Sequence, residues 1–171
     1  MGTRRLTLLR HGQAQPPEAY AEDFERPLTR RGGNEAAEMA KRILIRGDVP
    51  DLIVASPAER AWATAVIVAR VCELDAKALR CARELYSATP AAIWRLVTGL
   101  APALEHVLIC AHNPSLSDLA GRLGPQPQAR RLPTAGLARA IWNHAEWRAL
   151  QPETAVLCEL DDPDDLADSF S

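Results

Sequence analysis

The chain alternates between short apolar runs and longer stretches in which apolar residues return every three to four positions. Short continuous runs predict buried strands, whereas the longer period predicts helices with one apolar face. Strands are expected at 6–10, 51–55, 76–80, 105–111, 135–143 and 155–160, and helices at 29–47, 56–72, 90–100 and 114–121. This order predicts an α/β fold: a single-domain three-layer sandwich whose mostly parallel central sheet carries helices on both faces, with the last two strands at one side.

Capping residues sharpen the helix boundaries. Thr29 is a candidate N-cap and Gly47 a candidate stop for the first helix. Ser56-Pro57 and Asn113-Pro114 each have the form of an N-cap followed by proline at the first helical position, so two further helices are expected to begin there. With Ser56 as the cap, Arg60 lies in the first turn, and its side chain points back toward the end of the preceding strand.

Arginine and histidine side chains follow the ends of the predicted strands. Arg10 and His11 close the first strand, His112 follows the run 105–111, and Arg60 reaches the same edge from its helix. The carboxyl ends of parallel strands meet at one edge of a sheet, where ligands bind in open α/β folds. Each residue alone would be read as a solvated surface group. Together, two guanidinium groups beside helix amino termini suit a phosphoryl dianion, and a neutral imidazole can act as a nucleophile next to them.

The remaining polar residues give weaker signals. The segment 13–27 is polar and contains three prolines, so we expect a loop that forms one wall of the site. Glu84 is the carboxylate best placed to face a cleft at a strand end, although such a residue is more often a surface charge. His106, at the opposite edge of the sheet, and His144, in a turn, are expected to have no role in the site.

Length and charge limit the classes of function. With 171 residues, 47% of them hydrophobic, the chain can build one core but has little room for a second domain. Its formal net charge of −2 gives no general attraction to nucleic acid or to an anionic membrane surface, so an anion site must be local. We predict one domain over residues 1–160 and a disordered acidic tail over 161–171.

Targeting and redox signals are sparse. Residues 1–5 contain no apolar signal region, and no segment is apolar for the length of a membrane span, which favours a cytoplasmic protein. The four cysteines have no C-x-x-C spacing, so neither a zinc site nor a disulfide framework is expected, and they are interpreted as buried free thiols. They are Cys72, Cys81, Cys110 and Cys158.

Several short motifs follow one another in a recognisable order. They are Leu9-Arg10-His11-Gly12, Pro27-Leu28-Thr29 with Gly32, Ser56-Pro57-Ala58-Glu59-Arg60-Ala61 with Thr64-Ala65, Glu84, and Ala111-His112-Asn113-Pro114. This succession, over about the first 125 residues, resembles the histidine phosphatase (phosphoglycerate-mutase-like) superfamily, whose mark is a strand ending in Arg-His-Gly near the amino terminus. The small size is most similar to its SixA-type branch, named for phosphohistidine phosphatase activity. Trp62-Ala63 departs from the polar residue that many relatives carry before the Thr-Ala pair.

The resemblance implies a phosphoglycerate-mutase-like fold and a histidine phosphatase domain over residues 1–160. It implies a metal-independent phosphatase with His11 as the nucleophile, Arg10, Arg60 and His112 as phosphate contacts, His112 also taking part in catalysis, and Glu84 as a proton donor. No metal or cofactor is expected. The expected substrate is phosphohistidine on a protein. The alternatives are a phosphomonoester of a small metabolite, or a phosphate-binding regulatory module without turnover. A monomer is favoured, without a nucleic-acid or membrane partner.

Overall fold

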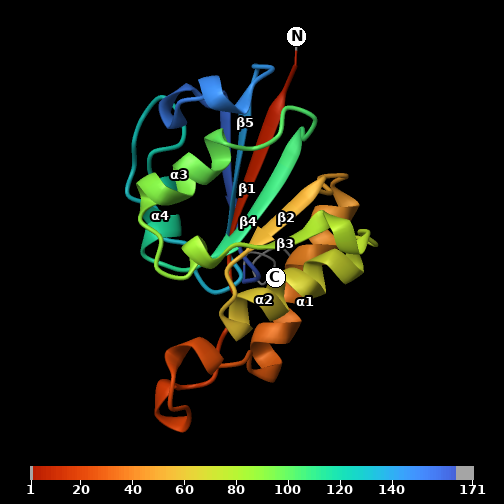
Figure 1. Ribbon diagram of the computed structural model, residues 1–171, viewed down its shortest axis with the longest axis vertical. Coiled ribbons are helices and arrows are strands. Elements are labelled where there is room, and N and C mark those ends of the chain that lie inside the picture. The colour runs from red at the N-terminus through yellow and green to blue at the C-terminus, as the bar shows by residue number, and fades with distance from the viewer. Residues whose placement is uncertain (1, 165–171) are drawn as a thin grey trace, which may run out of the picture.

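A six-stranded sheet forms the middle layer of the computed structural model, which describes residues 2–164 (Figure 1). The strands are β1 (Arg4–Arg10), β2 (Leu52–Ala55), β3 (Leu79–Cys81), β4 (His106–Ala111), β5 (Leu137–Trp142) and β6 (Leu157–Asp161). They lie in the order β3-β2-β4-β1-β5-β6. The first four in this order are parallel, whereas β5 runs antiparallel to both β1 and β6. The predicted mostly parallel sheet is confirmed, with β5 and β6 together at one side.

Helices cover both faces of this sheet, as predicted. They are α1 (Arg30–Ile45), α2 (Glu59–Val71), α3 (Pro90–Thr98) and α4 (Ser115–Ala120). Short 3-10 turns lie between them: η1 (Pro17–Ala19), η2 (Asp23–Glu25), η3 (Ala76–Ala78), η4 (Arg83–Leu85), η5 (Trp147–Ala149) and η6 (Pro152–Thr154). Helices α1 and α2 pack on one face, and α3 and α4 on the other (Figure 1).

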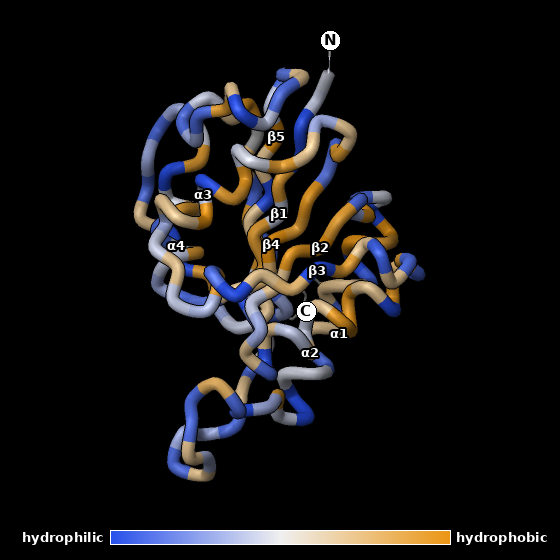
Figure 2. Tube along the Cα trace, viewed as in Figure 1, coloured by the Kyte–Doolittle hydropathy of each residue, from blue (hydrophilic) through white to orange (hydrophobic). Residues whose placement is uncertain are grey.

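The alternation of side chains along each strand supplies a core to both faces. In β1, Leu6 and Leu8 pack against the α3/α4 layer, whereas Leu9 packs against α1 and α2. In β4, Val107 and Leu108 divide between the two cores in the same way. Complete burial of one leucine contributes roughly 1.5–3 kcal/mol, and the strongly apolar colouring of the central strands in Figure 2 shows where this contribution is concentrated.

The helix starts agree with the predictions in two cases, α1 and α3, which begins at Pro90, and differ in the other two. Thr29 caps α1 as predicted, because its hydroxyl accepts a hydrogen bond from the amide of Gly32. The interpretation of Ser56 as an N-cap is wrong: α2 begins at Glu59 after Ala58, and the buried Ser56 hydroxyl contacts His112 and the amide of Ala58. The helix expected from 114 begins at Ser115, one residue later.

Two predicted segments also need correction. The strand expected at 76–80 is a 3-10 turn over residues 76–78, followed by β3, because the Asp75 side chain caps a turn there. The disordered tail was expected from 161, but Asp161 is the last residue of β6 and is buried. Its carboxylate accepts hydrogen bonds from Arg42 of α1 and from Arg46, which follows that helix, and these bonds fix it in place. Residues 165–171 of the expected tail lie outside the described residues.

The four cysteines differ in their exposure to solvent. Cys72 and Cys110 are buried as expected, but Cys81 is exposed because it lies on the three-residue edge strand β3. Cys158 is half-buried. Within residues 2–164, no helix has both the length and the apolar character required to cross a bilayer.

Candidate active site

The ends of β1 and β4 bring the two site histidines together. Arg10 and Ala111 are paired at the end of the parallel ladder, so His11 and His112 follow at the same edge. The amide of His11 donates to the carbonyl of Ala111, and the two imidazole centroids lie 5.1 Å apart. Arg60, in the first turn of α2, donates from Nε to Nε2 of His11 at 3.3 Å. The structure therefore places the four sequence-predicted residues His11, His112, Arg10 and Arg60 at one edge of the sheet.

The hydrogen bonds of His11 fix its tautomer. Its Nδ1 lies 2.7 Å from the carbonyl oxygen of Gly12, which only accepts, so Nδ1 carries the proton. Nε2 is then the unprotonated nitrogen, in agreement with the N–H of Arg60 that points at it. Burial lowers the pKa of His11 to about 3, and the hydrogen bond to Gly12 opposes this shift only in part. His11 is thus a neutral imidazole at pH 7, with its lone pair directed into the site.

His112 is held by Ser56, a contact that the sequence did not reveal. Nε2 of His112 lies 2.8 Å from the hydroxyl oxygen of Ser56, which is completely buried. Burial lowers the pKa of His112 to about 4, and the nearby Arg60 charge acts in the same direction. The other ring nitrogen, Nδ1, is buried without a hydrogen-bond partner among the described residues. When the Ser56 hydroxyl donates to Nε2, the proton of this neutral ring lies on Nδ1.

Arg10 is anchored by a loop on the far side of the site. Its guanidinium donates to the carbonyl of Leu132 at 3.0 Å, while its Nε is buried without a partner in the described part of the chain. The Leu132 carbonyl also accepts from the side-chain amide of Asn113, and Ser117 accepts from the Leu132 amide. Burial and the positive charge of Arg131 lower the pKa of Arg10. These contacts hold the Arg10 guanidinium at the edge of the sheet that also carries His11.

The backbone after His11 is fastened to the two helices on that face. The amide of Gly12 donates to the hydroxyl of Thr64 in α2, and that hydroxyl donates to the carbonyl of Arg60. A Cβ on Gly12 would lie 2.3 Å from the carbonyl oxygen of Gly32 in α1, so only glycine permits this approach. Thr64 and Gly32, which both belong to the motifs of the resemblance, therefore position the backbone directly after His11.

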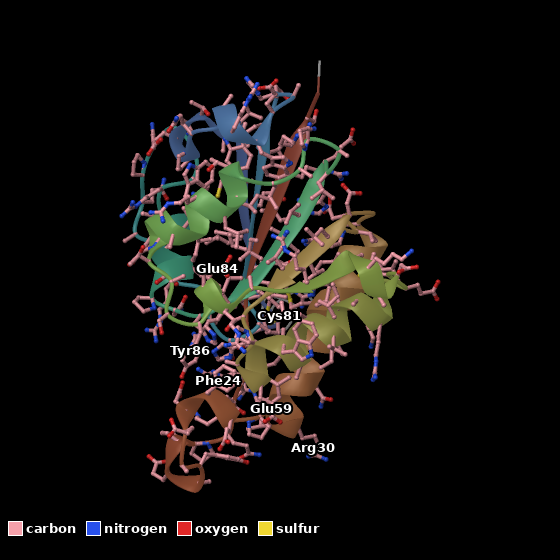
Figure 3. All side chains as sticks on the ribbon, viewed as in Figure 1. Phe24, Arg30, Glu59, Cys81, Glu84 and Tyr86 are labelled. Atoms are coloured by element: carbon pink, nitrogen blue, oxygen red, sulfur yellow. The ribbon has the colours of Figure 1, made fainter. Side chains whose placement is uncertain are left out.

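Asp23 of η2 also reaches the site, and sequence analysis missed it. Its backbone carbonyl accepts from Nη1 of Arg60 at 2.6 Å and its carboxylate from Nη2 at 2.8 Å. The hydroxyl of Tyr86 donates to the same carboxylate at 3.2 Å. Phe24 contacts Tyr86 edge to face, and Figure 3 shows the two rings next to each other at the base of the sheet. The segment expected to form a wall of the site thus contributes a carboxylate as well.

Glu84 has a different environment. It lies in η4, is exposed, and its side chain forms no hydrogen bond or ion pair within residues 2–164. A cavity of about 210 Å³ beside His112 is lined by Tyr86 and Asn113, but Glu84 is not part of its lining. Glu84 precedes Tyr86 by two residues, and both are labelled in Figure 3. Within residues 2–164, no hydrogen bond or ion pair connects Glu84 with the four central residues. Its role as a proton donor stays a prediction.

The other two histidines agree with their interpretation. His106 is buried at the opposite edge of the sheet and bonds to the hydroxyl of Thr7 at 2.9 Å. His144 is exposed and accepts from the amide of Glu146 in the same turn. In the part of the chain that the structure describes, no group of three or more His, Cys, Asp and Glu side chains is arranged to hold a metal ion.

Part of the chain matches a known protein family. Residues 6–88 match the family model described as "Histidine phosphatase superfamily (branch 1)". Among curated proteins, no sequence matches the chain.

Solved structures are similar over nearly the whole chain. A protein of Nakamurella multipartitia, assigned as the phosphohistidine phosphatase SixA, is 24% identical, with 95% of this chain and 98% of that chain covered and a TM-score of 0.78. A protein of Agrobacterium tumefaciens with the same assignment is 26% identical, with 83% and 93% covered and a TM-score of 0.73. The protein histidine phosphatase SixA in complex with tungstate is 23% identical, with 95% and 99% covered and a TM-score of 0.76.

Proposed function

Because the chain belongs to the histidine phosphatase superfamily and is a phosphatase, we propose that it acts in the cytoplasm on phosphohistidine of a protein, through a covalent intermediate on His11. One observation carries the proposal. The Gly12 carbonyl holds the proton of His11 on Nδ1, which leaves the lone pair of Nε2 directed at the guanidinium of Arg60 and beside His112. A neutral imidazole in this setting is a nucleophile placed next to its anion-binding groups.

In the first step, Nε2 of His11 attacks phosphorus in line. The new N–P bond forms while the P–N bond to the substrate imidazole breaks, and the electron pair of that bond stays on the leaving nitrogen. In the second step a water molecule attacks phosphorus and the bond to Nε2 breaks, with its electron pair returning to Nε2. The oxygen and both protons of the water leave with the phosphoryl group as dihydrogen phosphate. His11 regains its starting form.

Arg10, Arg60 and His112 are proposed to bind the phosphoryl oxygens. Nε of Arg10 and Nδ1 of His112 are buried donors without partners in the described structure, and buried polar groups are costly unless a partner satisfies them. A phosphoryl group would supply that partner. Charge spread over its oxygens in the transition state is stabilised by these donors, and the loss of one such donor typically lowers the rate about a hundredfold to a thousandfold.

The protonation states favour phosphohistidine over a phosphomonoester. Hydrogen bonds from Arg26 and Arg60 hold the pKa of Asp23 near 2, so the carboxylate closest to the site is an anion and has no proton to give. An alkoxide leaving group requires such a proton, whereas the imidazole of phosphohistidine brings its own. The likeness to structures described as SixA supports the same substrate class.

The experiment is to incubate the protein with a 32P-labelled phosphohistidine protein and to trap the adduct. We expect an acid-labile, alkali-stable label on the wild type and none on His11→Ala, with less than a hundredth of the activity left in the variant. EDTA should leave the wild-type rate unchanged, since arginines, not a metal ion, are proposed to neutralise the phosphate.

Controls separate the alternatives. Turnover of small phosphomonoesters at a higher kcat/KM than phosphohistidine proteins would replace the proposed substrate class. Phosphate binding without any turnover would indicate a regulatory module. The mechanism would be contradicted if EDTA abolished the activity and a divalent ion restored it. It would also be contradicted if His11→Ala kept a tenth of the wild-type activity.

A further inference from the structure

Asp23 takes most of the contacts of the Arg60 guanidinium. Nη1 of Arg60 donates to the Asp23 carbonyl at 2.6 Å, and Nη2 donates to the Asp23 carboxylate at 2.8 Å. Nε alone faces His11, at 3.3 Å. A planar guanidinium whose far nitrogens are both held by one residue has a fixed rotation about its long axis. The edge that remains is the one turned toward the nucleophile.

The Asp23 carboxylate is itself held from two other directions. Arg26 donates to its Oδ1 at 2.6 Å, and the Tyr86 hydroxyl donates to its Oδ2 at 3.2 Å. Tyr86 follows η4 and packs edge to face on the ring of His112. The carboxylate therefore connects three parts of the site. They are Arg60 of α2, Tyr86 with the His112 ring on which it packs, and the segment after Gly12.

The segment that carries Asp23 has little else to fix it. Neither η1 nor η2 contains a buried residue, and Phe24 is 39% exposed. In Figure 1 this segment extends away from the sheet and helices, and in Figure 2 it is largely hydrophilic. Its turns are attached by the polar contacts of Asp23 with Arg60 and Tyr86 and by the Phe24–Tyr86 ring contact, whereas Arg26 bonds within the segment, to Gln15 and Asp23.

We propose that Asp23 is a positioning residue, which aligns Arg60 for the transition state and makes docking of the 13–27 segment a condition for turnover. This inference rests on the proposed function, because Arg60 is the phosphate contact being aligned. Asp23 touches Arg60 and Tyr86 but not the reacting atoms, so its removal should affect the transition state chiefly through Arg60. Misplacement of a positioned group by about 1 Å can lower a rate a hundredfold.

The test is a double-mutant cycle on Asp23→Ala and Arg60→Ala, with vanadate affinity measured by calorimetry and kcat and KM measured on p-nitrophenyl phosphate. Vanadate adopts the trigonal-bipyramidal form of the transition state, so its affinity reports on alignment even in a variant that turns over slowly. We expect Asp23→Ala to lower kcat ten- to a hundredfold and to weaken vanadate about tenfold, with Asp23→Asn between Asp23→Ala and the wild type. In the Arg60→Ala background, Asp23→Ala should have no further effect.

Glu18→Ala is the matched control, because Glu18 is an exposed carboxylate of the same segment without a side-chain contact within residues 2–164. It should leave kcat and vanadate affinity within twofold of the wild type, and thermal unfolding should be unchanged in all variants of this exposed segment. Faster turnover or tighter vanadate binding by Asp23→Ala would overturn the proposal and show that Asp23 competes with the phosphoryl group for Arg60. Additive effects in the cycle would overturn it as well. A wild type that binds vanadate without turnover would contradict the proposed function, while the vanadate cycle would still decide the role of Asp23.

Discussion

At the scale of single residues, burial controls the chemistry of His11. The ring is 9% exposed and beside three groups that carry or acquire positive charge, so its charged form is strongly disfavoured. A nucleophile needs its lone pair, and this environment keeps the lone pair free over the whole neutral range.

The first prediction concerns titration of this ring. Because the pKa of His11 lies near 3, protonation removes the lone pair only as the pH falls toward that value. NMR spectra of the imidazole should therefore show no titration of His11 from pH 8 to pH 5, with assignment by the His11→Ala variant. A midpoint between pH 6 and pH 7 would contradict the neutral, buried state.

Glu84 leads to a second residue-scale prediction. If it protonates the leaving group, Glu84→Gln should reduce turnover of an alkyl phosphomonoester by the roughly hundredfold to ten-thousandfold typical of general acids, and that of a phosphohistidine much less. Burst kinetics must show that the first step is limiting, because the second step is common to both substrates. Equal losses on both would assign Glu84 to positioning or make another carboxylate the donor.

The four central residues could be predicted because each lies at the end of a strand with a clear hydrophobic pattern or in the first turn of a helix. Arg10 ends β1, His11 and His112 follow β1 and β4, and Arg60 is the second residue of α2. The contacts of Asp23 and Ser56 could not be predicted in this way. Asp23 lies 37 residues from Arg60 in a polar segment without periodicity, and Ser56 precedes a helix where a capping role fits equally well.

At the scale of elements, the start of α1 and the end of β1 form one unit. The Gly32 Cα faces the backbone of the loop after His11, and a Cβ there would lie 2.1 Å from the Gln13 carbonyl oxygen. The next residue, Gly33, has open space around the equivalent position. The two adjacent glycines that weaken the helix pattern in the sequence thus have different roles.

This difference gives a matched pair of variants. Gly32→Ala should lower the free energy of unfolding by about 2 kcal/mol or more, since backbone must move, and should reduce turnover by displacing the segment next to His11. Gly33→Ala should be neutral or stabilising by up to about 1 kcal/mol, because alanine favours a helix interior. Urea denaturation and kcat on p-nitrophenyl phosphate measure both effects. Equal stability of the two variants would contradict the close approach.

Element boundaries were less predictable than the elements themselves. The cap of α1 was correct because the Thr29 hydroxyl can accept from the Gly32 amide while it donates to Gln13, so its tertiary contact leaves the capping bond intact. The boundary before α2 was wrong because the Ser56 hydroxyl lies 2.8 Å from Nε2 of His112 and accepts only a longer bond, of 3.4 Å, from the amide of Ala58, so the helix begins at Glu59. Local sequence cannot distinguish these two uses of the same kind of side chain.

At the scale of the whole molecule, the buried His11 and His106 and the half-buried His112 make stability depend on pH. Burial lowers the pKa values of His11 to about 3 and of His106 and His112 to about 4, below the ordinary value of 6.5. Between pH 6.5 and about 4 the unfolded chain therefore binds more protons than the folded protein. The free energy of unfolding is at its full value above pH 6.5 and falls as the pH decreases through this window.

His106 offers a test of this dependence outside the site. One such histidine contributes a slope of about 1 kcal/mol per pH unit. His106→Gln should make the pH dependence of the free energy of unfolding, measured by urea denaturation from pH 6 to pH 4.5, shallower by about that amount. The slope is the readout, because loss of the contact to Thr7 also changes the absolute stability. An unchanged slope would mean that His106 is not neutral when folded.

The position of β1 in the middle of the sheet has a consequence for amide hydrogen exchange. Its backbone is bonded to β4 on one side and to β5 on the other, so its amides should exchange with deuterium only when the whole fold opens. The amides of residues 16–25, which have no buried neighbours in their own turns, should exchange early. His11 thus follows a strand whose amides are expected to exchange slowly. The Asp23 carboxylate that holds Arg60 belongs to a segment whose amides are expected to exchange early. Mild denaturant should therefore separate the nucleophile from its aligned arginine well before the fold is lost.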